Sequence, residues 1–133
     1  MHRCFGLLFL LLLASPLKSE NPDSLRISVG KAATAKEKIP ALISLSQYWT
    51  SNNLDSAIYY SGKLQQAALE AQDAEDYYRG CYNLVSALYE TGRREDALVE
   101  GHKAIAYFDK KENKAHKVDL LVLVAEKSRI FGH

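Results

Sequence analysis

The sequence predicts an all-α protein made of helical hairpins, and three observations carry that prediction. Apolar residues recur at every third or fourth position along most of the chain, as on one face of a helix. No proline follows Pro40, and no Asn-Gly or Asp-Gly pair joins alternating segments as in a β-hairpin. The chain also matches itself weakly when it is shifted by about 40 residues, a period typical of helical repeats. Its 133 residues leave room for one modest domain and exclude a multidomain enzyme.

Residues 1–19 are predicted to be a cleavable export signal. Met1–Arg3 supplies a basic start, and Phe5–Leu13 is a run of nine apolar residues. A membrane-spanning helix needs about 20 apolar residues, so this run is too short to cross a bilayer but fits the core of a signal peptide. Pro16 ends the run, and Ser19 offers a small residue for cleavage before Glu20. The alternative, a buried core helix, needs polar residues that this run lacks. We therefore expect an extracytoplasmic protein, either periplasmic or secreted.

Charge and cysteine content narrow the function classes further. The formal net charge is +1, and loss of Arg3 and Lys18 with the signal would bring it to about −1. A chain this neutral has no electrostatic footprint for nucleic acid or for an anionic membrane. Cys4 would leave with the signal, so Cys81 would have no partner for an internal disulfide. Packing must therefore stabilise the mature fold.

The rest of the chain divides into a leading segment, residues 20–38, and a repeat region, residues 39–133. Asn21–Ser24 has the composition of a helix start, so the leading segment is either a helix or a loose arm. In the repeat region the apolar positions define one face of each of three helices. The three sets are Ala57, Tyr60, Leu64, Ala68 and Ala71; Tyr77, Cys81, Leu84, Val85 and Leu88; and Ala97, Gly101, Ala104, Ile105 and Phe108. Breaks are expected at Ser51–Asn53, Gln72–Asp73, Thr91–Gly92 and Asn113, and such short connections favour antiparallel neighbours.

The shift of about 40 residues aligns the parts of a helical hairpin. The expected turn residues Asn52, Gly92 and Gly132 then coincide, and each suits the left-handed or relaxed conformation that ends a helix. Ala57 coincides with Ala97, and a small residue at that position lets the second helix approach the first closely.

These residues resemble a known family, the tetratricopeptide repeat, a helix–turn–helix unit of about 34 residues. The matching residues are Leu84, Leu88, Tyr89, Gly92, Glu95, Asp96, Ala97, Leu98, Lys103, Ala104 and Ile105, and Tyr48–Ala57 matches the same core. The chain departs from that pattern at Leu45 and Val85, where the family prefers Gly or Ala. It also departs at Ser61 and Gly101, where the family prefers a large aromatic residue. The resemblance implies an α-solenoid of about two and a half repeats, the third incomplete, in the long-helix variant of exported bacterial regulators.

No catalytic, cofactor or metal site is predicted. The histidines of the mature chain, His102, His116 and His133, form no His-Glu-x-x-His motif, and there is neither a paired Cys-x-x-Cys nor a glycine-rich phosphate loop. A thiol enzyme built on Cys81 is a distant alternative, since activation would need a histidine base within hydrogen-bond reach. Cys81 shares the apolar face of Leu84, where a cysteine acts as a small hydrophobic residue.

Binding of a protein or peptide is therefore the expected activity. In a tetratricopeptide-like array the first helix of each hairpin lines the concave face. The candidates on that face are Leu42, Ser46, Trp49 and Thr50 in the first repeat and Arg79, Tyr82, Ser86, Tyr89 and Glu90 in the second. Trp, Tyr and Arg carry much of the energy of protein interfaces. In the alternative interpretation, Trp49 and Tyr89 pack between adjacent repeats. A groove that clamps a peptide's terminal carboxylate is not supported, because only Arg79 and Asn83 are available for it.

The last expected helix, Val118–Arg129, is unusually apolar. It contains six apolar residues in a row, Leu120–Ala125, and is followed by Ile130 and Phe131. A helix that is apolar all round is normally buried on more than one side. We therefore include Leu121 and Val122 among the partner-binding residues. Three explanations stay open: the chain is a truncated gene product, the helix docks on a partner, or it pairs with a second copy to form a homodimer.

The sequence thus predicts an exported, non-enzymatic scaffold that binds protein or peptide and has no membrane span in its mature part. The alternative is the N-terminal sensor region of a bacterial signalling protein, either a histidine kinase or a transcriptional regulator.

Overall fold

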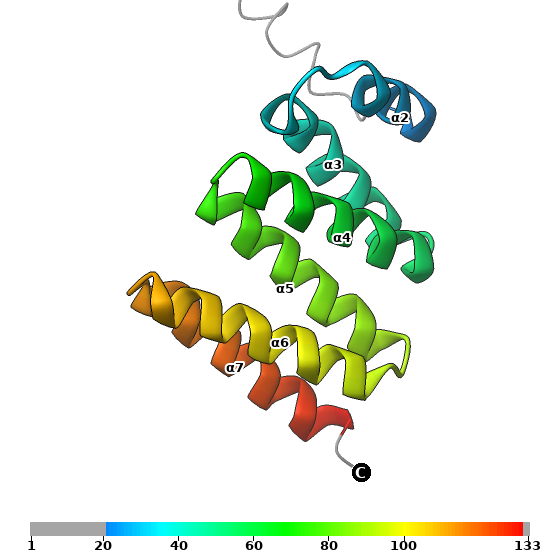
Figure 1. The fold of residues 1–133 in the computed structure, drawn as a ribbon. Coiled ribbons are helices and arrows are strands. Elements are labelled where there is room, and N and C mark those ends of the chain that lie inside the picture. Colours follow the sequence, from blue (N-terminus) through cyan, green and yellow to red (C-terminus); the bar gives the residue numbers. More distant parts are fainter. Residues whose placement is uncertain (1–20, 132–133) are drawn as a thin grey trace, which may run out of the picture.

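The computed structural model describes residues 21–131, and this part is helical with short connections (Figure 1). The helices are α2 (Pro22–Lys31), α3 (Ala35–Thr50), α4 (Leu54–Glu70), α5 (Ala74–Glu90), α6 (Arg94–Lys110) and α7 (Lys114–Phe131). No strand occurs within these residues, so the predicted all-α class is confirmed. The predicted export signal, residues 1–19, and the expected turn residue Gly132 lie outside the described residues.

The helices follow one another as a repeat-like stack. Each helix packs against the next, and α5 also contacts both α3 and α7. Three residues separate each helix from the following one, so the chain reverses direction at every turn, from α2 at one end to α7 at the other (Figure 1). Short connections of this kind place neighbouring helices antiparallel, as the sequence predicted.

Five of the six described helices begin at side-chain caps; α6 begins after Arg93, whose side chain makes no capping hydrogen bond. Asn21, Thr34, Asn53 and Asp73 each accept a hydrogen bond from a backbone N–H in the first turn of the helix that follows. Asn113 does the same for α7, where its Oδ1 accepts from the N–H of His116 at 3.1 Å. These caps satisfy backbone donors that the first turn of a helix leaves without a partner.

Three of the turns use a left-handed residue. Gln72, Gly92 and Glu112 have φ values of 55°, 79° and 56°. In each turn the next residue's N–H donates to a carbonyl five positions earlier, as from Asp73 to Ala68 at 2.9 Å, which is the Schellman arrangement. Gly92 is confirmed in the predicted conformation.

Asn52 lies in the predicted turn after α3, but it does not take the left-handed conformation. Gly92 has a positive φ, and Asn52 does not. Its side-chain Nδ2 instead donates to the carbonyl of Tyr48 at 2.6 Å, so an amide hydrogen bond ends α3 without a left-handed residue.

The leading segment is a helix, and the next helix begins earlier than expected. The N–H of Glu37 donates to Thr34 Oγ1 at 3.2 Å, and Glu37 Oε2 accepts from the N–H of Ala33 at 3.0 Å. This reciprocal capping starts α3 at Ala35, so the expected boundary between residues 38 and 39 lies inside α3. Pro40 stands within the helix and is exposed. Leu25 of α2 is buried in a cluster with residues of α3.

The predicted apolar faces form the core. Tyr77, Cys81, Leu84, Val85 and Leu88 of α5 are all buried. Ala57 of α4 and Ala97, Gly101, Ala104 and Phe108 of α6 are buried as well. Two glycines mark close approaches, because a Cβ on Gly80 would lie 3.0 Å from the backbone nitrogen of Gln65, and one on Gly101 would lie 2.7 Å from Val124 Cγ2.

Candidate functional site

A shallow hollow of about 300 Å³ lies between α5 and α7. We call it the α5–α7 hollow; it is lined by Tyr78, Tyr82, Asp119, Val122, Leu123 and Glu126. Tyr82 is 39% exposed and Val122 is 48% exposed, so an aromatic ring and an aliphatic side chain meet solvent on neighbouring helices. Two of the predicted partner-binding residues, from distant parts of the sequence, are therefore brought together.

Side-chain contacts between the N-terminal parts of α5 and α7 form one side of the hollow. The Tyr78 ring stacks on the His116 ring with centroids 4.0 Å apart and planes at 11°. The Tyr78 hydroxyl donates to Asp119 Oδ2 at 3.3 Å, and His116 Nε2 lies 2.7 Å from Glu75 Oε2. Burial, together with the negative charge of Asp119, raises the pKa of Tyr78 to about 12. These contacts hold α7 against α5 and fix the position of Val122 relative to Tyr82.

Arg79 and Ser86 lie on the same side of α5 as Tyr82, at helical spacings of three and four residues. Arg79 is exposed, and its Nη1 is 4.0 Å from Asp76 Oδ1, a weak pair. Burial and the neighbouring Asp73 raise the pKa of Asp76, while Arg79 acts in the opposite direction. Ser86 is half-buried, so it contributes less surface than Arg79 does.

Tyr89 is not part of this surface. It is 1% exposed, and its hydroxyl oxygen is 3.1 Å from Ser128 Oγ of α7. The alternative interpretation holds for this residue, since it packs between helices and its ring cannot meet a partner.

The candidates from the first repeat are also placed differently from expectation. Leu42 and Ser46 are buried. Ser46 Oγ accepts a hydrogen bond from Asn83 Nδ2 of α5 at 2.9 Å, so it joins two helices. Trp49 packs on the cluster formed by Leu25, Ala41 and Leu45, on the side of α3 that α2 covers. Thr50 alone of the four is exposed.

The spacing between the helix caps explains why the candidates of the first repeat are not exposed as expected. Thr34 and Asp73, which cap α3 and α5, are 39 residues apart, whereas Asp73 and Asn113, which cap α5 and α7, are 40 apart. The shift of one residue turns the face of a helix by about 100°. Leu42 therefore matches the buried Cys81 rather than the exposed Tyr82.

A second feature beside the hollow is an apolar stripe on the outer side of α7. We call Val118, Leu121, Val122 and Ala125 the α7 stripe, because helical spacing places them on one face. Val118 is 52% exposed and Leu121 is 44% exposed, while Leu120 and Leu123 on the other side are buried. The predicted candidates Leu121 and Val122 thus belong to one exposed apolar surface.

Cys81 has the environment of a structural cysteine. It is fully buried, and burial raises the pKa of its thiol to about 11, although hydrogen bonds from Gln65 and Tyr77 lower it in part. Gln65 Nε2 donates to Cys81 Sγ at 3.1 Å. A nucleophilic cysteine needs a thiolate near neutral pH, so this environment argues against the thiol-enzyme alternative.

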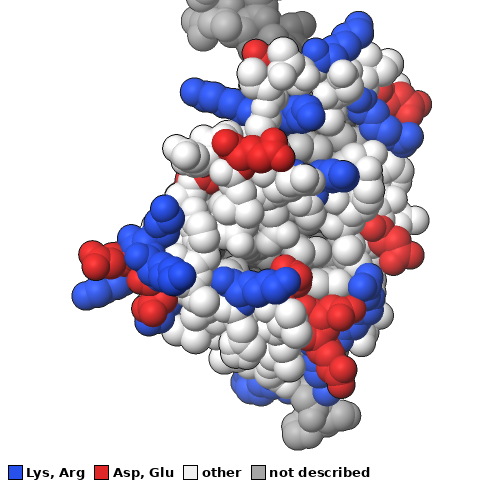
Figure 2. All heavy atoms as spheres, in the orientation of Figure 1, with Lys and Arg blue, Asp and Glu red and all other residues white. Residues whose placement is uncertain are grey.

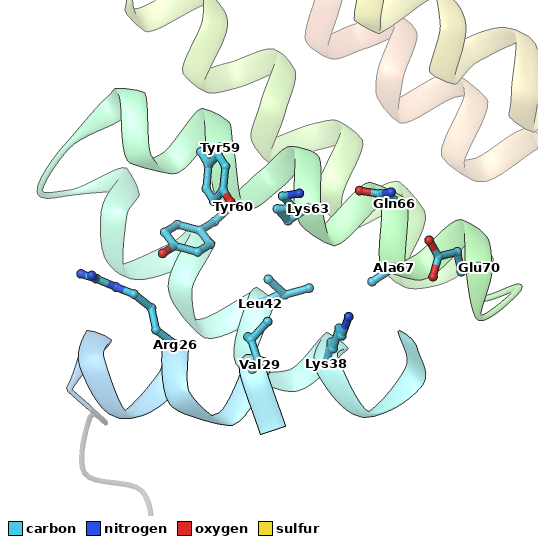
Figure 3. Close-up of a pocket in the computed structure, with 11 residues that line it drawn as sticks. Arg26, Val29, Lys38, Leu42, Tyr59, Tyr60, Lys63, Gln66, Ala67 and Glu70 are labelled. Carbon is cyan, nitrogen blue, oxygen red and sulfur yellow. The ribbon is translucent and has the colours of Figure 1, made fainter. Parts of the chain in front are cut away.

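A cavity that the sequence did not predict lies between α2, α3 and α4 (Figure 3). Its volume is about 450 Å³. Its lining includes the apolar side chains of Val29, Leu42 and Ala67, one from each helix, and the rings of Tyr59 and Tyr60 from α4. Three cations, Arg26, Lys38 and Lys63, and one carboxylate, Glu70, surround it. Local patterns could not reveal it, because it exists only where α2 and α4 both pack on α3 and leave a space between them.

Comparison of the chain with protein-family models, with curated proteins and with solved structures found no match. Among residues 21–131 no group of three or more His, Cys, Asp and Glu side chains is placed to hold a metal ion. No helix in that part of the chain is long and apolar enough to cross a membrane.

Charges of both signs are interspersed on the face drawn in Figure 2, and a broad uncharged area separates them. Such a surface offers no single-signed patch to a polyanion. The α5–α7 hollow and the α7 stripe are suited to non-covalent contact with an apolar partner surface.

Proposed function

We propose that this chain is a protein-binding module of the tetratricopeptide type, which docks a helix of a partner protein on the α7 stripe. The observation that carries the proposal is the exposure of Val118, Leu121 and Val122, at 52%, 44% and 48%, on a single helix face. Contiguous exposed apolar residues of this kind mark interaction surfaces.

The internal repeat supports a helix as the partner element. The α7 positions Leu121 and Ala125 correspond, at the 40-residue spacing of the caps of α5 and α7, to Cys81 and Val85. Both residues of α5 are buried in the core, to which α6 contributes Ala97, Ala104 and Phe108. A partner helix that packed on α7 as α6 packs on α5 would cover the α7 stripe, and full burial of a Val or Leu side chain is favourable by about 1.5–3 kcal/mol.

The α5–α7 hollow adds specificity beside the stripe. Tyr82 provides an exposed ring, and Arg79, Asp119 and Glu126 provide a polar margin. An apolar centre with a polar rim is the usual anatomy of a protein interface. The apolar run at Phe5–Leu13 supports the further proposal that this binding takes place outside the cytoplasm.

The experiment compares charge substitutions on and off the stripe. Leu121→Glu and Val122→Glu place a carboxylate where the partner helix would pack, whereas Val99→Glu makes the same change at a 53% exposed position on α6. Each purified variant is immobilised and exposed to extract of the source organism, and bound proteins are quantified by mass spectrometry.

We expect a defined set of proteins that the unmodified chain and Val99→Glu capture and that both α7 variants lose. Sedimentation of the unmodified chain and of Leu121→Glu shows whether the occupant is a second copy. Equal capture by all variants, or no capture above background together with a monomeric chain, contradicts the proposal. Circular dichroism melting checks that each variant is folded.

A further inference from the structure

The cavity between α2, α3 and α4 remains open for a structural reason. Both α2 and α4 pack on α3, but within the described residues they make no backbone contact with each other. On α5, by contrast, the Tyr77 ring packs against Tyr107 of α6 with centroids 4.4 Å apart. Helix α2 has no aromatic residue and presents Val29 and Gly30 to the cavity. The space is therefore not filled by the protein's own side chains.

The charged groups around this space do not neutralise one another. Lys38 of α3 and Lys63 of α4 reach it from opposite walls (Figure 3). Among the described residues no carboxylate lies within ion-pair distance of either; Lys63 Nζ lies 5.5 Å from the centroid of the Tyr59 ring. Arg26 is paired at 3.5 Å with Asp23, and both side chains are mostly exposed. The positive charges exceed the single carboxylate of Glu70.

The remaining lining is apolar and aromatic. Val29 and Leu42 lie between the charged ends, and Tyr60 points into the space beside Arg26 (Figure 3). Arg26 and Glu70 stand at opposite ends. Ligand cavities typically enclose about 300–1,000 Å³ and combine an apolar lining with a few polar groups. At about 450 Å³ this cavity falls in that range.

We infer that this cavity binds a small organic anion with an aliphatic or aromatic body. Lys38 and Lys63 hold the anionic group, a carboxylate or a phosphate monoester, and the body lies on Val29, Leu42 and Tyr60. Glu70 disfavours a second anionic group at its own end of the cavity, opposite Arg26. This site is separate from the α7 stripe, because its lining residues all belong to α2, α3 and α4.

The probes are 3-phenylpropionate, phenyl phosphate and the neutral 3-phenylpropanamide, each titrated into the purified chain by calorimetry. We expect at least one anion to bind, and the neutral amide to bind at least about tenfold more weakly than that anion. A tenfold loss of affinity corresponds to the loss of one charge-assisted contact. The anion that binds more tightly identifies the source as carboxylate or phosphate. Lys63→Gln and Lys38→Gln should each weaken anion binding about tenfold, while Lys36→Gln, an exposed lysine outside the cavity, should not.

A matched pair of glycine variants tests the place of binding. A Cβ added at Gly30 or at Gly62 would meet no atom within 4 Å, so both helices accept a side chain at these positions. Gly30 lines the cavity and Gly62 does not. Gly30→Leu should fill the space and abolish binding, and Gly62→Leu should leave it unchanged. Equal binding of the amide, binding that survives Gly30→Leu, or no binding of either anion at millimolar concentration overturns the inference.

Discussion

Gly101 of α6 and Val124 of α7 approach so closely that a Cβ on the glycine would lie 2.7 Å from Val124 Cγ2. The Val124 side chain takes the space that a side chain at position 101 would occupy, so the backbone of α6 packs directly against a side chain of α7. The glycine at position 101 therefore has a steric cause.

Gly101→Ala should destabilise the fold by about 1–3 kcal/mol, because an added methyl group overpacks a filled interface. Gly62→Ala is the matched control, since a Cβ there meets nothing within 4 Å, and it should stabilise the helix by about 0.5–1 kcal/mol. Urea unfolding followed by circular dichroism measures both. A Gly101→Ala protein as stable as Gly62→Ala would show that the two helices are not in contact at this point.

The left-handed turn residues make a second prediction. Gly92→Ala should cost about 1 kcal/mol, and Glu112→Gly should gain about 0.5–1 kcal/mol, because a residue with a Cβ is strained at positive φ. Gln47→Gly, at an exposed position inside α3, should instead cost about 0.5–1 kcal/mol. Thermal unfolding of the three variants distinguishes the turn effect from the general cost of glycine. A loss of stability in Glu112→Gly equal to that in Gln47→Gly contradicts the assigned turn.

The buried thiol predicts a dependence on alkaline pH. Folding raises the pKa of Cys81 from 9.0 to about 11, so the folded state favours the neutral thiol. The resulting stabilisation is complete below about pH 9 and is lost as the pH rises toward 11. The urea midpoint of the unmodified chain should therefore fall more steeply over this range than that of Cys81→Ala. Identical slopes, or rapid alkylation of Cys81 in the folded chain at pH 7, would contradict its burial.

The wall of the α5–α7 hollow gives a fourth prediction. Tyr78→Phe removes the hydrogen bond to Asp119 and should cost about 0.5–1.5 kcal/mol. Tyr82→Phe is the control, because the exposed Tyr82 makes a ring contact with Tyr78 but its hydroxyl has no hydrogen bond in the described part of the chain. Equal stabilities of the two variants, measured by urea unfolding, would remove Tyr78 from the contact between α5 and α7.

The sequence predicted those features of the fold that have a local signal in the spacing of residues. The apolar face of α5, from Tyr77 to Leu88, was predicted correctly because helical spacing is a local signal. The breaks at Gln72–Asp73 and Asn113 were predicted, but the left-handed conformation of Gln72 and Glu112 was missed, because neither residue type favours positive φ. The start of α3 was missed, although the pair Thr34 and Glu37 contained the capping signal.

The candidate site was predicted in part. Tyr82 and Val122, which were predicted separately as partner-binding residues, lie together, but Trp49 does not join them, because one residue fewer separates the caps of α3 and α5. No periodicity within α3 could reveal that difference. The cavity at Lys38 and Lys63 depends on where α2 rests on α3, which is a tertiary relationship without a local sequence signal.

The most direct test of partner docking on α7 is site-specific photo-crosslinking in the source organism. A photoreactive phenylalanine analogue replaces Leu121 on the α7 stripe in one strain and Val99 on α6 in another, both at exposed positions. We predict a discrete crosslinked protein from position 121 that is absent from position 99. The same product from both positions, or none from position 121, would contradict docking on the α7 stripe.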